Sequence, residues 1–356
     1  MIDLTSYLLG RKSGGGGGSP GGGGGGGGGS TEEWIGDGNT HLWITLPEGR
    51  TSPMLGVCPN GTVTVDWGDG TAPDVLTGTN TSTVKWTPNH EYATAGDYVI
   101  TLTVDGEMGF GGRAASYENA YILRNSPTYD SCNIGYQNSL QRIEFGNGVT
   151  NIRDSAFHSC YSLTSIAIPD SVTEIAAQVF RVCRSLENIS IPDSVTSIGD
   201  YAFADCSSLA DINIPNGVRT VGTSAFDGCY SLASVTIPDG VTSIGSNTFR
   251  SCYSLRNVYV PDSVNSIGSY AFNHCDSLGS ITIPSAVTKI QTRVFQYCYS
   301  MKFCDFTKHT AVPTLAATDT FQNIPADCEI RVPAALVDAW KAATNWSTYA
   351  DYIVGV

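Results

Sequence analysis

The sequence predicts a mainly β protein, in which a small β-sandwich precedes a solenoid of 23-residue repeats with short helical turns. Segments between residues 41 and 105 alternate apolar and polar residues, as half-buried strands do. From about residue 132 to 306, phenylalanine, cysteine, leucine and proline recur with a period of 23 residues, which indicates stacked repeats. Within each repeat, apolar residues spaced three apart indicate a helical turn that faces the same core as a short strand.

The composition excludes several classes of function. The formal net charge of −14 argues against nucleic-acid binding, which requires a basic surface. No apolar run approaches the roughly 18–20 residues of a membrane span. The first residues show no basic segment before a long apolar stretch, so no signal peptide is visible, although a gene start placed too late would hide one.

Two segments precede the first expected strands. Residues 1–12 form a short, partly apolar peptide, and residues 13–30 are almost entirely glycine. Such a glycine tract predicts a flexible linker with an end-to-end reach of roughly 23 Å, and packed polyglycine helices in an oligomer are the alternative. The start MIDLTSYLLGRKSGGGGG resembles attachment peptides ahead of glycine-rich linkers in phage structural proteins. The resemblance implies an assembly partner for residues 1–12.

Residues 31–107 carry two signals of a known β domain. The run VDWGDGT (65–71) is followed by HEYATAGDYVITLTV (90–104). Together they resemble the PKD domain family of small immunoglobulin-like β-sandwiches. The resemblance implies a spacer or binding module, not an enzyme. Asp66 and Asp69 are expected to bond their own turn, and a bound cation is the alternative.

The repeat region is assigned to residues 132–306, after an irregular bridge at 108–131. In the segment SLADINIP, period-two alternation turns both isoleucines toward the core, and Asp211 and Asn213 toward solvent. One repeat cannot bury its own apolar side, so neighbouring repeats must stack into one continuous core.

The pattern IPDSVTSIGDYAFADCSSL resembles the BspA-like, bacterial surface class of leucine-rich repeats. Residues 332–354 are similar to the segment that caps such arrays, and the cap is assigned to residues 307–356. The resemblance implies a leucine-rich-repeat solenoid that serves adhesion or protein-ligand binding at a surface, without catalysis.

Seven of the 11 cysteines occupy one position of the repeat. We interpret them as core residues, because free cysteine behaves as a small buried hydrophobe. Parallel side chains on equivalent backbones rarely give disulfide geometry, and no repeated histidine or CxxC pair accompanies them to hold a metal. No metal or cofactor is therefore expected. The column consists of Cys160, Cys183, Cys206, Cys229, Cys252, Cys275 and Cys298, and Cys58, Cys132, Cys304 and Cys328 lie outside it without an assigned role.

A polar residue follows the proline of each repeat. Turn chemistry predicts that its side chain satisfies nearby backbone N–H groups. Calcium bound between neighbouring carboxylates is the alternative, weakened because the column is not acidic throughout. Its members are Asp170, Asp193, Asn216, Asp239, Asp262 and Ser285.

Two outward surfaces of the repeats are candidate binding sites. The outer strand positions are small and polar and form either a solvated face or a contact surface for a carbohydrate or protein. Aromatic residues are favoured anchors in recognition, and Tyr259 is the one aromatic residue there. The candidate ligand-binding residues are Asn188, Asp211, Asn213, Thr236, Asn257 and Tyr259. The position after the repeat cysteine offers a second candidate, an aromatic patch or simple packing, from Tyr161, Tyr230, Tyr253 and Tyr299.

No catalytic motif accompanies these surfaces. The sequence contains no H-E-x-x-H, G-x-S-x-G, Walker or paired zinc motif, so no enzyme is expected. The leading hypothesis is a surface-recognition or adhesion protein, extracellular or virion-associated, whose solenoid binds a cell-surface glycan or protein. A receptor-binding component of a phage virion is one form of it. The alternative is a purely structural appendage of a larger assembly, docked through residues 1–12.

Overall fold

The computed structural model describes most of the chain after residue 35, and residues 36–356 form one compact unit. The expected attachment peptide at 1–12 and the glycine linker at 13–30 lie outside the described residues. The described residues are 36–48, 52–80, 84–111, 123–124, 136 and 138–356.

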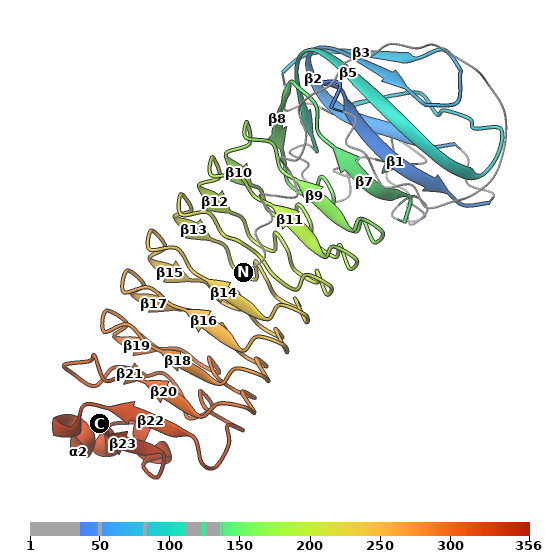
Figure 1. Ribbon diagram of the computed structural model, residues 1–356. Helices are drawn as coiled ribbons and strands as arrows, with labels where there is room; N and C mark the ends of the chain where they lie inside the picture. The colour runs from blue at the N-terminus through green and yellow to red at the C-terminus, as the bar shows by residue number, and fades with distance from the viewer. Residues whose placement is uncertain (1–35, 49–51, 81–83, 112–122, 125–135, 137) are drawn as a thin grey trace, which may run out of the picture. The chain divides into compact units, whose positions relative to one another are not determined.

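An antiparallel β domain makes up the first part of this unit (Figure 1). Its main sheet has the order β1-β5-β2-β3, and the first residues of β2 also pair with β4 and β6. Alternate residues of β1 and β5 are buried, as the period-two pattern predicts. The strands are β1 (Thr40–Leu46), β2 (Met54–Asp66), β3 (Asp74–Thr79), β4 (Lys85–Trp86), β5 (Gly96–Phe110) and β6 (Leu123–Arg124).

The two sequence signals of this domain meet in space. The His90 ring stacks on the Trp67 ring with centroids 4.5 Å apart, and the Tyr92 hydroxyl donates to the Trp67 carbonyl at 2.8 Å. Asp66 accepts the Gly68 N–H at 2.9 Å, and Asp69 accepts the N–H of the second residue after it at 3.1 Å. The turn interpretation of the two aspartates is therefore confirmed.

The sheet of the β domain continues into the solenoid. Strand β1 pairs antiparallel with β7 (Leu140–Glu144), and β5 pairs parallel with β8 (Val149–Ile152). The boundary expected at residue 107 falls inside β5, which runs to Phe110. The first coil of the solenoid is thus hydrogen-bonded to the β domain on two sides, and most of the expected bridge at 108–131 lies outside the described residues.

Each solenoid coil contributes one short strand to each of two faces (Figure 1). Within each face neighbouring strands are parallel, with partners usually 23 residues apart, as in the pairing of Ser234 with Asn257. The first, which we call the strand face, contains β9 (Ser165–Ala167), β11 (Asn188–Ser190), β14 (Ser234–Thr236), β16 (Asn257–Tyr259), β18 (Ser280–Thr282), β20 (Phe303–Asp305), β22 (Glu329–Val332) and β23 (Ile353–Gly355). The second contains β10 (Glu174–Ile175), β12 (Ser197–Ile198), β13 (Thr220–Val221), β15 (Ser243–Ile244), β17 (Ser266–Ile267), β19 (Lys289–Ile290) and β21 (Thr314–Leu315).

A column of stacked phenylalanines runs through the core. From Phe157 to Phe295, consecutive rings stack with centroids 5.4–5.8 Å apart and interplanar angles of 2–14°. All of these side chains are fully buried. Such near-parallel stacking is possible because the identical position in each coil repeats the same backbone geometry.

The cysteine column lies beside the phenylalanines and confirms the core interpretation. Every described cysteine is buried and free. From Cys183 to Cys298, each thiol donates to the carbonyl of the phenylalanine 26 residues earlier at 3.0–3.3 Å. Burial raises the pKa of the Cys160 thiol to about 12, so the group stays protonated. Cys304 points inward from β20, level with Ile281, and Cys132 lies outside the described residues.

The expected helical turn in each repeat is a run of separate turns. In one coil the Cys206 N–H donates to the carbonyl of Phe203, three residues earlier, at 3.1 Å. The Phe203 N–H instead donates to Ala225 of the next coil at 2.8 Å. Alternate N–H groups therefore bond within the coil and between coils. This alternation requires a left-handed backbone at two positions in each coil, for example Tyr201 (φ 56°) and Asp205 (φ 60°).

Val182 occupies the second left-handed position of its coil with φ 64°. A left-handed backbone costs an L-residue about 1–2 kcal/mol and suits a β-branched residue least. We expect Val182→Gly to raise the free energy of unfolding by about 1 kcal/mol relative to Val182→Ala. Glycine already stands at the equivalent Gly228. Urea unfolding of both variants would show the ranking, and an alanine variant as stable as the glycine variant would contradict it.

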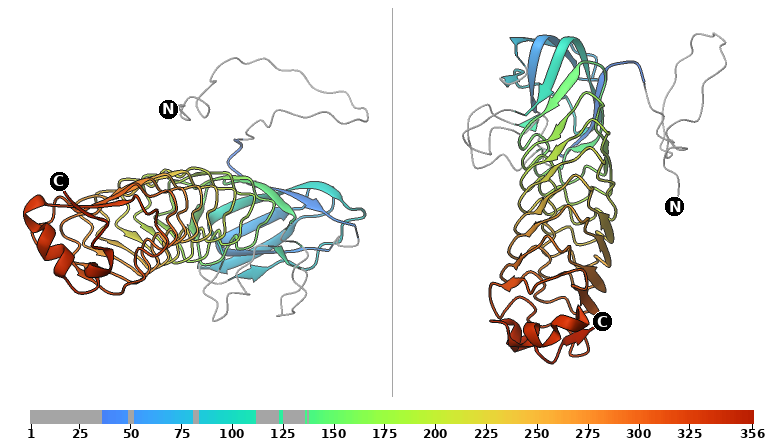
Figure 2. Two further views of the ribbon diagram at one scale, coloured as in Figure 1. Left: turned by 90° about the horizontal axis from the view of Figure 1, so that it is seen from below. Right: turned by 90° about the vertical axis from the view of Figure 1, so that its left-hand side faces the viewer.

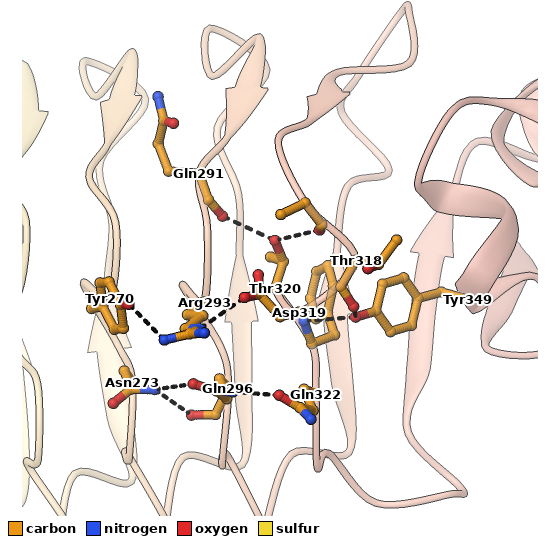
Figure 3. Close-up of polar contacts among 12 residues, drawn as sticks. Tyr270, Asn273, Gln291, Arg293, Gln296, Thr318, Asp319, Thr320, Gln322 and Tyr349 are labelled. Carbon is orange, nitrogen blue, oxygen red and sulfur yellow. Dashed lines mark hydrogen bonds and ion pairs between the residues drawn. The ribbon is translucent and has the colours of Figure 1, made fainter.

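Polar side chains also connect the last coils (Figure 3). The Asn273 amide donates to the side-chain oxygen of Gln296 at 3.1 Å, and the Gln296 amide donates to Gln322. Arg293 donates to the Tyr270 hydroxyl and to Asp319, each at 2.7 Å. Each coil therefore holds its neighbour through side chains as well as through the backbone.

The C-terminal segment closes the end of the solenoid (Figure 2). It consists of η3 (Ala334–Leu336), α2 (Val337–Ala342), η4 (Trp346–Tyr349) and the strand β23. Trp340 and Trp346 are completely buried, and their rings contact Phe306 with centroids 5.0 and 5.6 Å away. These two indoles shield the apolar core of the last coils from solvent.

Candidate functional site

The strand face places the predicted polar residues on the outside of the solenoid. The six candidate residues are all exposed, and the Tyr259 side chain is the most exposed of the solenoid's large hydrophobic groups at 54%. Thr236 and Tyr259 are direct neighbours across β14 and β16. The alternation expected for Asp211 and Asn213 is confirmed, because both are exposed and Ile212 between them is buried.

The strand face is interrupted at this same coil. Residues 211–213 form no strand, and the Ile212 N–H bonds to the carboxylate of its neighbour Asp211 at 2.9 Å. A side chain that takes a backbone donor competes with the ladder between coils. Asn188 therefore lies in a different sheet from the pair β14 and β16, and the six candidates do not share one continuous sheet.

Charged groups border Tyr259. Lys308 Nζ lies 2.9 and 3.0 Å from the two carboxylate oxygens of Asp262. Hydrogen bonding to Asp262 raises the pKa of Lys308. In this column, therefore, the carboxylate of Asp262 pairs with a lysine. The turns after the prolines are present, but the backbone closes them, as in the bond from the Val195 N–H to the Pro192 carbonyl at 3.1 Å. The expectation that the aspartate carboxylates close these turns is not met.

A second surface follows the coils where two columns of outward residues lie side by side. We call it the tyrosine edge, and it contains Tyr230, Tyr253, His274, Tyr297 and Tyr299. Tyr230 and Tyr253 stack with centroids 5.0 Å apart, and Tyr253 meets the edge of His274 at 6.2 Å. His274 stacks on Tyr297 at 4.2 Å, and Tyr297 lies 5.9 Å from Tyr299. Five rings from four coils thus form an unbroken row.

The row includes three of the four tyrosines predicted for an aromatic patch. Tyr161 is not part of it, because the next coils carry Arg184 and Ser207 at the equivalent position. The guanidinium of Arg184 instead lies over the Tyr161 ring, 5.5 Å from its centroid. His274 and Tyr297 were not predicted. They belong to the neighbouring left-handed column, in which other residue types prevail.

The backbone holds the tyrosine edge in register. The N–H groups of Ser254 and Ser277 donate to the carbonyls of Tyr230 and Tyr253 in the preceding coil, both at 3.1 Å. Side chains on such paired coils lose little further freedom on binding a partner, so they are well suited to act as anchors.

One carboxylate interrupts the tyrosines. Asp276 takes the place of the tyrosine between Tyr253 and Tyr299, and its Oδ1 atom lies 3.4 Å from Nδ1 of His274. This Oδ1 atom is buried and accepts no hydrogen bond. Between Asp205 and Tyr299 the two columns carry no lysine or arginine. The tyrosine edge is therefore aromatic and locally acidic.

The family comparison agrees with this geometry. A model of the BspA type leucine rich repeat region matches six copies over residues 132–255 and 173–302. The solenoid is a BspA-type leucine-rich-repeat array. No match was found among curated proteins. No helix of the described residues is long and apolar enough to cross a membrane.

Several solved structures are similar to the chain. A leucine rich cell surface protein from Faecalibacterium prausnitzii is 31% identical over 52% of this chain, with a TM-score of 0.36. This chain covers only 57% of that protein. A leucine-rich repeat protein from Bacteroides ovatus is 25% identical over 61% of this chain and 66% of its own, with a TM-score of 0.37. The T. pallidum leucine rich repeat protein is 26% identical over 50% of this chain and 73% of its own, with a TM-score of 0.36.

Asp227 lies beneath the tyrosine edge in the BspA-type array. Burial raises its pKa to about 6, partly offset by Arg250, whose Nη1 atom lies 3.7 Å from the carboxylate. A folded-state pKa above the unfolded value of about 3.9 means that the folded state binds the proton more tightly. This contribution to stability is present below pH 4 and is lost as the pH rises through 6.

We therefore expect Asp227→Asn to be more stable than the wild type at pH 7 by about 1 kcal/mol, after allowance for solvent screening. The two proteins should differ little at pH 4. Urea unfolding at both pH values measures the difference, and Asp239→Asn at an exposed turn serves as the control. The same pH dependence in the wild type and Asp227→Asn would contradict the expectation.

Proposed function

We propose that the protein is a non-enzymatic surface-recognition protein, whose BspA-type solenoid binds a cell-surface glycan or protein outside the cell. The observation that carries the proposal is the tyrosine edge. Tyr230, Tyr253 and Tyr299 are 43%, 41% and 52% exposed, although each ring could have packed inward. A contiguous row of exposed aromatic rings on a rigid backbone is typical of an interaction surface.

The segments before the solenoid extend the proposal. Residues 1–12 would attach the protein to a larger assembly, and the glycine linker would tether the folded unit to it. The resemblance of this start to phage structural proteins supports a virion as that assembly, and a PKD-like spacer between linker and solenoid would be consistent with it. A structural appendage docked through residues 1–12, without recognition, is the second candidate.

Binding of the labelled full-length protein to bacterial cells, mucin and a glycan panel tests recognition. A double variant with Tyr230→Ser and Tyr253→Ser removes the tyrosine edge. A matched variant with Asn257→Ser and Tyr259→Ser changes the strand face to a similar extent. We expect the first variant to lose at least tenfold in binding, because anchor residues carry most of the binding energy.

The outcomes separate the candidates. Loss of binding only in the strand-face variant would move the site to Tyr259 and Asn257. No binding of the wild type to any surface would contradict the recognition proposal and leave the structural appendage, for which a partner of residues 1–12 would then be sought.

A further inference from the structure

We infer that the tyrosine edge binds an arginine-bearing segment of a partner protein, with a guanidinium seated on Tyr253 or Tyr299 beside Asp276. The inference rests on the proposed function and narrows its ligand to a protein with exposed arginines.

The chain itself shows which group its outward tyrosines accept. Arg184 lies over Tyr161 with its Cζ atom 5.5 Å from the ring centroid, and Arg293 lies over Tyr270 at the same distance. In both pairs the arginine stands 23 residues after the tyrosine, at the equivalent position of the next coil. Attraction between a cation and the face of an aromatic ring explains the arrangement.

The second pair also includes a carboxylate (Figure 3). Arg293 donates to the Tyr270 hydroxyl and, through Nε, to Asp319, each at 2.7 Å. A tyrosine, a guanidinium and an aspartate thus follow one another along the coils. The aspartate neutralises the charge that the ring attracts.

The tyrosine edge has the same tyrosine and aspartate without the arginine. Tyr253 is followed one coil later by Asp276 and two coils later by Tyr299. Within the described residues, no lysine or arginine lies over these two rings, and both remain exposed while Tyr161 and Tyr270 are half-buried. The Asp276 Oδ1 atom makes no hydrogen bond. A guanidinium from another protein would complete the arrangement.

Charge favours a cationic occupant over an anionic or neutral one. The nearest arginine to this part of the edge in the sequence, Arg250, is directed to Asp227 at 3.7 Å. Aspartates flank the aromatic row at both Asp205 and Asp276, and the chain as a whole carries a formal net charge of −14. Phosphorylated, sulfated or sialylated ligands would be repelled, and a neutral sugar would leave Asp276 without a partner.

Fluorescence anisotropy of a labelled peptide with three Gly-Arg-Ser repeats, titrated with the full-length protein at low salt, tests the inference. The comparison peptide contains citrulline, which keeps the shape of arginine without its charge. We expect the citrulline peptide to bind about tenfold or more weakly, and added salt to weaken the arginine peptide. Tyr253→Leu and Asp276→Asn should each weaken the arginine peptide about three- to tenfold.

Two matched variants keep the test specific. Tyr259→Leu and Asp211→Asn make the same chemical changes on the strand face and should leave peptide binding unchanged. Equal binding of the citrulline peptide, or equal loss in the strand-face variants, would overturn the inference. Binding of a neutral glycan that is lost in Tyr253→Leu but kept in Asp276→Asn would also overturn it.

Cell binding by the same variants separates this inference from the proposed function. If Tyr253→Leu loses cell binding while both peptides bind alike, surface recognition stands and the arginine inference fails. If the peptides behave as expected and the wild type binds no cell, mucin or glycan, the arginine site stands and the surface proposal fails.

Discussion

Phe226→Ala should lower the free energy of unfolding by about 3–5 kcal/mol, the largest effect expected of a single change in the middle of the solenoid. The Phe226 side chain is fully buried and stacks on Phe203 and Phe249, with centroids 5.4 and 5.5 Å away. Alanine would leave a cavity between coils that are fixed by backbone hydrogen bonds and cannot close it. Chemical unfolding followed by circular dichroism would measure the change.

The position of Phe226 predicts a further effect. Coils contact only their neighbours, so a weak contact in the middle of the array reduces the cooperativity between its two halves. The unfolding transition should therefore broaden. Tyr230→Ala in the same coil removes an exposed ring and should change stability by less than about 0.5 kcal/mol. A loss below about 1 kcal/mol for Phe226→Ala would show that the coils can close the gap.

The core of the solenoid could be predicted from the sequence because its signal repeats. The phenylalanine and cysteine columns recur every 23 residues, and only an inward position tolerates so little variation between stacked units. Alternation did the same for Asp211 and Asn213. Both signals are local, and the fold merely stacks them.

The turns between the strands could not be predicted in the same way. Gln178, Val182 and Tyr201 adopt a left-handed backbone, and nothing in these residue types favours it. Hydrogen bonds to the next coil impose that conformation, and such bonds exist only after stacking. The helical-turn prediction followed the spacing of apolar residues and missed this competition.

The candidate site was predictable only in part for a similar reason. The tyrosines after the cysteines share one column, so the period reveals them. His274 and Tyr297 lie in the column two residues earlier, which also contains serine, valine, aspartate and glycine. Only the three-dimensional arrangement shows that these rings join the tyrosines. Arg184 likewise separates Tyr161 from the row through a contact that no spacing rule contains.

Trp346→Ala should be the second change with a large effect, and a local one. The indole is completely buried against Phe306, Phe321 and Trp340, and its Nε1 atom donates to the Pro313 carbonyl at 2.7 Å. Its removal should destabilise the cap by about 3–5 kcal/mol. Hydrogen exchange should then accelerate in residues 295–353, while the coils around Phe203 remain protected.

The local nature of this loss follows from the one-dimensional array. The coil that contains Phe203 has no contact with the cap, so its protection depends on its own neighbours. Trp346→Phe keeps most of the buried surface and should retain most of the protection, and Lys341→Ala on the exposed side of α2 is the matched control. Uncapped coils expose apolar core and strand edges, so Trp346→Ala should also aggregate on heating. Equal acceleration of exchange in every coil would show instead that the solenoid unfolds as one cooperative unit.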